Sequence, residues 1–540
     1  MITEIISRRQ MVQGALGVSA LTALGATGCS NEGRGGADIA DNSGGTLPDY
    51  IPFEGIPMDL EGEDGVSDTM LGYPESPVAV TDGPPSDGEN INVFAVTNTP
   101  PPPGLDSNEY WQALNERLGC TLSVSLVPTG DFADRFQTAV AGNQLPAVFS
   151  YFHNQVPGLP AFLNERAADL TEMLAGSAVK NYPFLANIPT ASWRATMYGG
   201  KIYGVPIPRG PQSSMVMYAR EDLLEQMGIE FAPDSWETFL DFCREITGGG
   251  KWALGSVPIT YIRQMMGIPN AWFEDGGTLV SANEHERQEE ALEAGRKLVS
   301  EGLIHPDGFT ANNPQRKTWT VNGTTPIISG TYSAWNDFSN YPIPEGFRLR
   351  VVGPPDAEGD GSRPIWLGAP THNLTSISVD AQDRAESLLS FLNYLAAPFG
   401  SQEHLFKNYG LKGVHHELEG TNPVLTEKGR KESQLGLEYM AEGPWVNYHS
   451  DDPDVAQAQY DSQRELVPTA VPNPVEGLYS NTMSRKGNQI DSALGSAQND
   501  ILQSREAVSS WADAVATWKR DGGDTIKDEL EEALANSQGS

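Results

Sequence analysis

Short apolar runs alternate with amphipathic stretches between residues 90 and 154. The runs INVFAV, CTLSVSLV and VFSYF, which begin at Ile91, Cys120 and Val148, have the length and composition of buried strands. Between the first two runs, apolar positions that begin at Tyr110 recur every three or four residues, which is the period of an amphipathic helix. This β-α-β-α-β order predicts a parallel sheet with helices packed on it, and ligands of such sheets bind at the carboxyl ends of the strands.

The apolar segment GKIYGVPIP, at residues 200–208, marks a change of unit along the chain. It is opened by glycines and closed by prolines, so it is typical of a buried strand that leaves one compact unit for the next. A second strand at 213–218 and two helices joined at Gly228 follow. Further helices with one apolar face are predicted at residues 284–301, 383–396 and 490–518.

Length and charge exclude several classes of protein. A chain of 540 residues is too long for one hydrophobic core, so two or three domains are expected. The net charge of −36, from 71 acidic and 35 basic residues, argues against binding to nucleic acid or to anionic lipid through overall charge. Three cysteines exclude a disulfide framework, although one disulfide between Cys120 and Cys243 stays open in an exported protein.

The first 28 residues predict an export signal rather than a folded element. SRRQMV, at residues 7–12, matches the twin-arginine (Tat) signature, and the apolar run at 14–26 is too short to span a bilayer. The run ends in ATGCS, which resembles a lipobox in which Cys29 is lipidated and becomes the new N-terminus. We therefore expect a lipid-anchored protein on the extracytoplasmic face of the cell membrane. The alternative is an ordinary cleavable signal with an incidental cysteine.

Residues 29–89 differ in composition from the rest of the chain. From residue 30 they hold 14 acidic residues and one basic residue, Arg34, among many glycines, prolines and serines. Such a segment buries too little apolar surface to offset its chain entropy, which predicts a flexible acidic tether. Met70 and Tyr73 would let part of it dock on the body.

Several motifs, taken in order, resemble one family. They are AGNQLP at 141–146, GKIYGVP at 200–206, PDSWE at 233–237, YGLKGVH at 409–415 and WKRDGGDTIKDELEEAL at 518–534. Together they are similar to the extracellular solute-binding proteins (family 1, carbohydrate-type) of bacterial ABC transporters. Within that family, they resemble the large sugar-binding lipoproteins that include the alginate-binding proteins. The resemblance covers about residues 90–535.

This resemblance implies an α/β, two-lobed periplasmic-binding-protein-like (type II) fold with a ligand cleft between the lobes. The first lobe is expected to hold residues 90–208 and 370–430, and the second lobe residues 209–369 and 431–540. It also implies capture of an oligosaccharide by lobe closure about hinge strands near 205–215 and 369–376, and delivery to membrane permease subunits. A peptide or another non-sugar solute is the main alternative ligand. We expect a monomer that does not bind nucleic acid.

Signatures of catalysis are missing from the sequence. It contains no G-x-S-x-G, H-E-x-x-H, P-loop or G-x-G-x-x-G motif, so we do not expect an enzyme. An exported glycan-active enzyme would need two carboxylates facing one cleft, and no spacing nominates such a pair. A surface adhesion or scaffold protein is a third alternative, and it would show no ligand-driven closure.

Two segments could suggest a metal, although no cofactor is expected. The loop at 356–362, DAEGDGS, begins like a calcium loop, but Leu367 stands where a bidentate glutamate would be needed, so a turn is favoured and structural calcium stays open. His415 and His416, followed by Glu417, could ligate a metal, but packing of a loop histidine is the favoured interpretation.

Aromatic residues are frequent near predicted loops and strand ends. Sugar rings pack on aromatic planes, and their hydroxyls need convergent polar partners. For an aromatic residue the alternative is core packing, and for Arg209 it is a salt bridge that holds the hinge. The predicted ligand-binding residues are Asn98, Asp131, Tyr151, His153, Arg209, Trp272, Tyr332, Trp335, Trp366, His372 and Trp445.

Overall fold

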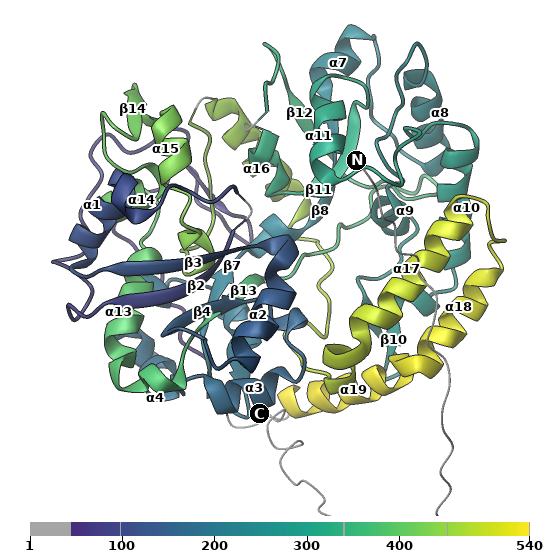
Figure 1. Cartoon of the computed structure of the whole chain (residues 1–540). Coiled ribbons are helices and arrows are strands. Elements are labelled where there is room, and N and C mark those ends of the chain that lie inside the picture. Colours follow the sequence, from purple (N-terminus) through teal and green to yellow (C-terminus); the bar gives the residue numbers. More distant parts are fainter. Residues whose placement is uncertain (1–44, 98, 339–340, 451, 539–540) are drawn as a thin grey trace, which may run out of the picture.

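The computed structural model describes residues 45–97, 99–338, 341–450 and 452–538. They form two units, each with its own sheet, and the chain passes between the units more than once (Figure 1). We call the unit around the five-stranded sheet the first lobe and the unit around the three-stranded sheet the second lobe.

The first lobe is built on five strands, β2 (Ile91–Thr97), β3 (Leu122–Pro128), β4 (Val148–Tyr151), β7 (Val205–Pro208) and β13 (Thr371–Ile377). Their order is β3-β2-β4-β13-β7. The predicted parallel sheet is confirmed for the first three strands, because β2 runs parallel to both β3 and β4. Strand β13 returns from the far end of the second lobe and lies antiparallel to β4 and β7.

Helices and short hairpins cover the first-lobe sheet. The side chain of Asn108 caps the first of these helices by accepting a hydrogen bond from Trp111 N, as its place before an apolar run favours. The helices are α1 (Glu109–Leu118), α2 (Phe132–Ala141), α3 (Leu159–Arg166), α4 (Thr171–Leu174), α5 (Pro183–Ala186), α6 (Thr190–Trp193), α13 (Ala385–Leu395), α14 (Gln402–Tyr409) and α15 (Glu427–Glu432). The hairpins are β5 (Met197–Tyr198) with β6 (Lys201–Ile202) and β14 (His416–Glu419) with β15 (Asn422–Leu425).

The second lobe has an antiparallel sheet of β11 (Ile327–Thr331), β8 (Met215–Arg220) and β12 (Leu349–Val352), in that order. The predicted PDSWE helix start is present, because Ser235 caps α8 in a capping box with Thr238. The helices of this lobe are α7 (Glu221–Gln226), α8 (Trp236–Ile246), α9 (Ile259–Met265), α10 (Gln288–Ser300), α11 (Asn313–Val321), α12 (Ala334–Asp337) and α16 (Pro453–Leu466).

Three C-terminal helices extend the second lobe. They are α17 (Asn488–Leu502), α18 (Ser510–Trp518) and α19 (Asp524–Gln538), drawn in yellow beside α10 in Figure 1. Their apolar faces share one hydrophobic cluster with Leu292 of α10 and with the hairpin of β9 (Trp272–Asp275) and β10 (Thr278–Ser281). The predicted apolar stripe near the C-terminus therefore packs on the second lobe.

The two lobes meet where the segments at residues 209–214 and 368–370, which connect the lobes, lie side by side. Arg209 N donates to Pro370 O at 2.8 Å, and Gly368 N donates to Ser214 Oγ at 2.9 Å. A Cβ atom on Gly368 would lie 2.2 Å from the carbonyl carbon of Ser213, so only glycine permits this approach. The chain also stays in the first lobe beyond residue 430, where we expected it to leave, since the segment from Leu435 to Ala441 joins the first-lobe core.

Residues 45–89, which we call the N-terminal strap, lie against the body. Tyr73 is 3% exposed in a cluster with Phe399, and Phe53 packs edge-on against Phe184 at 5.7 Å. The prediction of a flexible tether is therefore wrong for these residues. The prediction relied on the average composition of the segment. A few apolar side chains, which change that average little, are enough to hold it against distant parts of the chain.

The strap also crosses the junction of the lobes. Its short strand β1 (Asp68–Thr69) pairs in parallel with β16 (Val446–Asn447). Ser67 N donates to Gln463 Oε1 at 3.0 Å, and the side-chain amide of Asn447 is held by Thr69 and by Gln212. These buried polar contacts tie the strap to elements of both lobes.

Cys120 and Cys243 are buried and free, in the cores of different lobes, so they form no disulfide. His415 is fully buried, with Nε2 at 3.2 Å from Glu432 Oε2, which is the packing interpretation. In the loop at 356–362, Asp356 is paired with Arg363 and accepts Glu358 N, as in a turn.

Within the described part of the chain, no group of three or more histidine, cysteine, aspartate or glutamate side chains could hold a metal ion. None of the described helices combines the length and the apolar character needed to cross a membrane.

Candidate functional site

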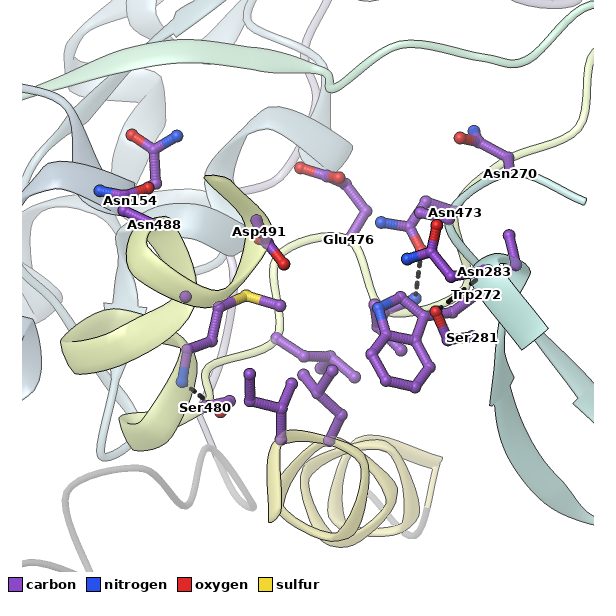
Figure 2. A pocket seen from close by; sticks show the side chains of 18 of the residues that line it. Asn154, Asn270, Trp272, Ser281, Asn283, Asn473, Glu476, Ser480, Asn488 and Asp491 are labelled. Atoms are coloured by element: carbon purple, nitrogen blue, oxygen red, sulfur yellow. Dashed lines mark hydrogen bonds between the residues drawn. The ribbon is translucent and has the colours of Figure 1, made fainter. Parts of the chain in front are cut away.

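A cavity of about 590 Å³ lies between the two lobes and the C-terminal helices. The first lobe contributes His153 and Asn154, just after β4, together with Tyr198 from β5. The second lobe contributes Trp272 and Trp366. The segment that leads from α16 into α17, with α17–α19, forms the remaining wall (Figure 2). A molecule in this cavity would therefore touch both lobes at once.

Aromatic rings form part of the apolar wall, beside aliphatic side chains such as those of Leu494 and Leu530. Trp272 lies 6.2 Å from Trp518, centroid to centroid, and Tyr198 meets Tyr479 edge-on at 5.9 Å. The Nε1 of Trp366 donates to Ile268 O at 2.9 Å, which fixes the indole while the ring stays half-buried. Fixed aromatic planes of this kind suit the C–H faces of a sugar ring.

Amide side chains supply most of the polar lining. Figure 2 shows Asn154 and Asn488 close together on one side of the cavity, and Asn270, Asn283 and Asn473 on the other. Asn270 is held in place, because its Nδ2 donates to the carbonyls of residues 367 and 471, each at 2.9 Å. Amides both donate and accept hydrogen bonds, so they match hydroxyl groups without requiring a charge.

The charged groups of the lining do not pair with one another. Arg263 donates from Nε to Gln288 Oε1 at 3.1 Å and from Nη2 to Gln498 Oε1 at 2.8 Å, and burial lowers its pKa to about 10. Burial raises the pKa of Glu476, although a hydrogen bond with Asn473 opposes the shift. Asp491 accepts a hydrogen bond from Trp518 Nε1 at 3.0 Å.

A second group of predicted residues lies next to the cavity, at the crossing between the lobes. The Arg209 guanidinium lies 5.8 Å from the centre of the Trp445 ring. Burial lowers the pKa of His372 to about 4, and the positive charge of Arg209 adds to this shift. His153 belongs both to this group, through its effect on the pKa of His372, and to the cavity lining.

Three predicted residues belong instead to hydrophobic cores. Tyr151 and Tyr332 have no exposed surface, and Trp335 is 4% exposed. Tyr332 donates its hydroxyl to Ser462 O at 3.3 Å, and Trp335 packs edge-on against Tyr218. These rings pack in cores and do not line the cavity, which agrees with the core-packing alternative, and their contact with ligand stays a prediction.

The two remaining predicted residues are Asp131 and Asn98. Asp131 is exposed just before α2 and does not line the cavity. Asn98 lies outside the described residues. The sequence prediction thus placed His153, Trp272 and Trp366 in the cavity, and Arg209, His372 and Trp445 beside it.

The sequence analysis missed the C-terminal contribution to the cavity. Glu476 and Asn473 lie in the PNPVEG loop, whose mixture of proline, glycine and polar residues was the available signal of an irregular, functional loop. Trp511 and Trp518 lie at apolar positions of the helical pattern at 490–518, and that pattern predicts only that they pack in a core. They pack in the C-terminal cluster and also line the cavity.

Two lobes around one cavity define a binding protein that holds its ligand between domains. A family model described as bacterial extracellular solute-binding protein matches residues 109–418, more than half of the chain. The chain belongs to this family, as the motifs in the sequence predicted.

Two curated relatives are similar over most of their length. Lipoprotein LipO of Bacillus subtilis (strain 168) is 22% identical over 489 residues, which cover 83% of this chain and 93% of LipO. The polygalacturonan/rhamnogalacturonan-binding protein YtcQ of the same strain is 21% identical over 449 residues, which cover 77% of this chain and 86% of YtcQ.

Solved structures share the fold. An HMO-binding ABC-transporter-associated solute-binding protein from Bifidobacterium longum infantis has a TM-score of 0.62 at 14% identity, covering 85% of this chain and 99% of that chain. The Streptococcus pneumoniae substrate-binding protein FusA, in complex with kestose, has a TM-score of 0.61 at 14% identity, covering 83% and 99%. The alginate-binding protein AlgQ2 has a TM-score of 0.59 at 13% identity, covering 85% and 99%. The predicted two-lobed α/β fold is confirmed.

Proposed function

We propose that this protein is the lipid-anchored substrate-binding component of an ABC importer, and that it captures an extracellular oligosaccharide and delivers it to permease subunits. The observation that carries the proposal is the cavity of about 590 Å³ with fixed tryptophans and many amide groups on walls from both lobes. Such a lining fits a ligand with apolar ring faces and many hydroxyls.

Capture follows from the position of the cavity. A ligand that contacts both lobes only when they are close together favours the closed state by its additional contacts. Movement requires a narrow junction, and the crossing at Arg209–Pro370 and Ser214–Gly368 provides closely packed strands about which the lobes rotate. The closed form then docks on the permease.

The relatives support a sugar as the ligand. YtcQ is named as a binder of polygalacturonan and rhamnogalacturonan, FusA was solved with kestose, and AlgQ2 is named as alginate-binding. A peptide or another non-sugar solute is the remaining alternative within the same function.

The anchor is proposed from the sequence. Cys29 and the Tat signature lie outside the described residues, and the support is their order with the apolar run, together with the relative LipO, which is named a lipoprotein. Mass spectrometry of the mature N-terminus tests it, since the proposal expects a diacylglycerol-modified Cys29. An unmodified N-terminus, cleaved elsewhere, would contradict the anchor and leave the binding function untouched.

The test of capture is thermal unfolding of the full chain in detergent against a panel of oligosaccharides and peptides. A ligand that binds only the native state adds about 2.7 kcal/mol of stability at a hundredfold excess over its dissociation constant. We expect a higher midpoint with one class of glycan and recovery of that glycan uncut. Cleavage of the glycan would indicate an enzyme, and a shift with peptides alone would overturn the sugar assignment.

A further inference from the structure

Arg209 lies at the junction of the lobes and makes no ion pair with the residues that the structure describes. Its Nε is buried and has no hydrogen-bond partner, and its guanidinium forms no ion pair with any residue that the structure describes. In the sequence analysis, the alternative to ligand binding by Arg209 was a salt bridge that holds the hinge. The described residues form no such bridge, although acidic residues outnumber basic ones by 71 to 35.

Two further polar atoms beside Arg209 lack partners. They are Trp445 Nε1, on the ring that faces the guanidinium, and His153 Nδ1. A buried polar atom that makes no hydrogen bond costs free energy, so a native protein keeps such an atom for a reason. Here, the guanidinium and the indole N–H can only donate, and the imidazole nitrogen donates in one tautomer. The three groups can therefore all donate hydrogen bonds to one acceptor. A carboxylate is the acceptor that best matches the geometry of a guanidinium.

The cavity lies within reach of this cluster. His153 lines the cavity and lies near His372, which in turn lies near Arg209. A ligand in the cavity can therefore extend one end past His153 toward Arg209. Glu438 interacts electrostatically with Arg209 without forming an ion pair, and burial raises the pKa of this carboxyl, which favours its neutral form.

We propose that Arg209, His153 and Trp445 form a subsite for one carboxylate at the end of an otherwise neutral glycan. The inference rests on the proposed function, because it assigns the chemical class of the glycan that the cavity holds. The remainder of the cavity does not suit further carboxylates. Arg263 is already held by two glutamines, and the acidic groups Glu476 and Asp491, whose pKa values burial raises, supply no positive charge for a further carboxylate. A polyuronate is therefore a poorer ligand than a glycan with a single terminal uronic acid.

The experiment is isothermal titration of the full chain in detergent with matched trisaccharides. The probes are galactotriose, galactotriose ending in one galacturonate, and trigalacturonate, with maltotriose and its singly glucuronate-ended counterpart as a second series. We expect the singly charged trisaccharide of one series to bind at least about tenfold more tightly than its neutral counterpart. Trigalacturonate should bind more weakly than the singly charged galactose probe.

Variants assign the preference to the subsite. Arg209→Gln should weaken binding of the charged probe more than binding of the neutral probe, and so remove the preference. Arg209→Lys should keep part of the preference, because it keeps the charge and loses the planar donor geometry. Arg505→Gln, at an exposed arginine between α17 and α18, removes the same charge from a residue that does not line the cavity and should change nothing.

Each result decides one of the two proposals. Equal binding of neutral and charged probes, or an equal loss of both in Arg209→Gln, overturns the subsite and leaves glycan capture standing. If no glycan binds to the wild type while a peptide does, the sugar assignment of the proposed function fails and the subsite fails with it.

Discussion

Two aromatic residues show how packing decides whether a ring can contact a ligand. Trp366 is half-buried, with its indole N–H fixed by Ile268 O, so one edge of the ring is anchored while part of the ring still faces the cavity. Tyr332 carries the same kind of aromatic surface but is covered on every side. The two rings differ in exposure because different neighbours surround them, and the residue type does not decide this.

Trp366→Leu should weaken binding of the captured glycan about five- to tenfold, because stacking on an aromatic plane contributes about 0.5–1.5 kcal/mol beyond burial. Titration calorimetry on the wild type and the variant measures the change. Trp252→Leu is the matched control, since Trp252 is also half-buried but packs against His305 away from the cavity. Equal losses in both variants would mean that general destabilisation causes the effect.

The ionisation of Glu476 makes the stability of the folded protein depend on pH. Burial raises its pKa above the ordinary value of 4.5, so in the unfolded chain the carboxyl ionises more easily than in the folded protein. Its ionisation therefore costs stability at neutral pH, and the cost disappears as the pH falls below the ordinary pKa.

Glu476→Gln should raise the unfolding temperature at pH 7, with a gain that shrinks toward zero near pH 4. Differential scanning calorimetry from pH 4 to pH 8 follows the gain. The exposed Glu506→Gln should show no such trend. A lower unfolding temperature for Glu476→Gln at pH 7 would show that the carboxylate makes a stabilising contact.

At the scale of elements, the N-terminal strap departs most from its sequence. Its residues pack against both lobes, and its strand β1 pairs with β16 where the lobes meet. Helices behaved as expected, because capping residues and apolar stripes are local signals. The strap has no such period, and its structure depends on partners several hundred positions away.

Tyr73→Ala tests whether the strap stabilises the body. Tyr73 is 3% exposed, with its ring 5.0 Å from that of Phe399 and its hydroxyl 3.1 Å from His404 Nδ1. Its removal should lower the free energy of unfolding by about 3 kcal/mol, in the range of buried aromatic truncations. Urea unfolding measures the change, and Tyr50→Ala, at a 50% exposed strap residue, should cost less than about 0.5 kcal/mol. A loose tether would show no loss in either variant.

At the scale of the whole molecule, two sheets with separate cores share one cavity and a narrow junction. The two lobes have separate hydrophobic cores, which is the arrangement expected of lobes that move as rigid bodies. The proposed capture uses this arrangement, since it expects the ligand to contact both walls fully in one relative position of the lobes.

Small-angle X-ray scattering should therefore show a smaller radius of gyration when the glycan identified by the thermal test is added. The reason is that closure brings the lobes together around the cavity. An unchanged radius at saturating ligand would favour a static binding surface, as in an adhesion or scaffold protein. Scattering with a glycan that gives no thermal shift provides the control.

Sequence alone determined the elements and the family. Strand length, helical period, capping residues and ordered motifs are local properties, and they located most elements and the family. The predicted strand at 200–208 is divided into β6, which pairs with β5, and β7, which joins the five-stranded sheet. Local signals also placed His153, Trp272 and Trp366 near strand ends and loops, and these residues line the cavity.

Only the tertiary structure decided which surfaces meet. Tertiary packing buries Tyr151, Tyr332 and Trp335, places C-terminal helices in the cavity wall and holds the strap against the body. It also leaves Arg209 without an ion pair among the described residues. The physical reason is the same in each case. Burial and pairing depend on side chains brought from distant parts of the chain, and periodicity shows that a face is apolar without showing what covers it.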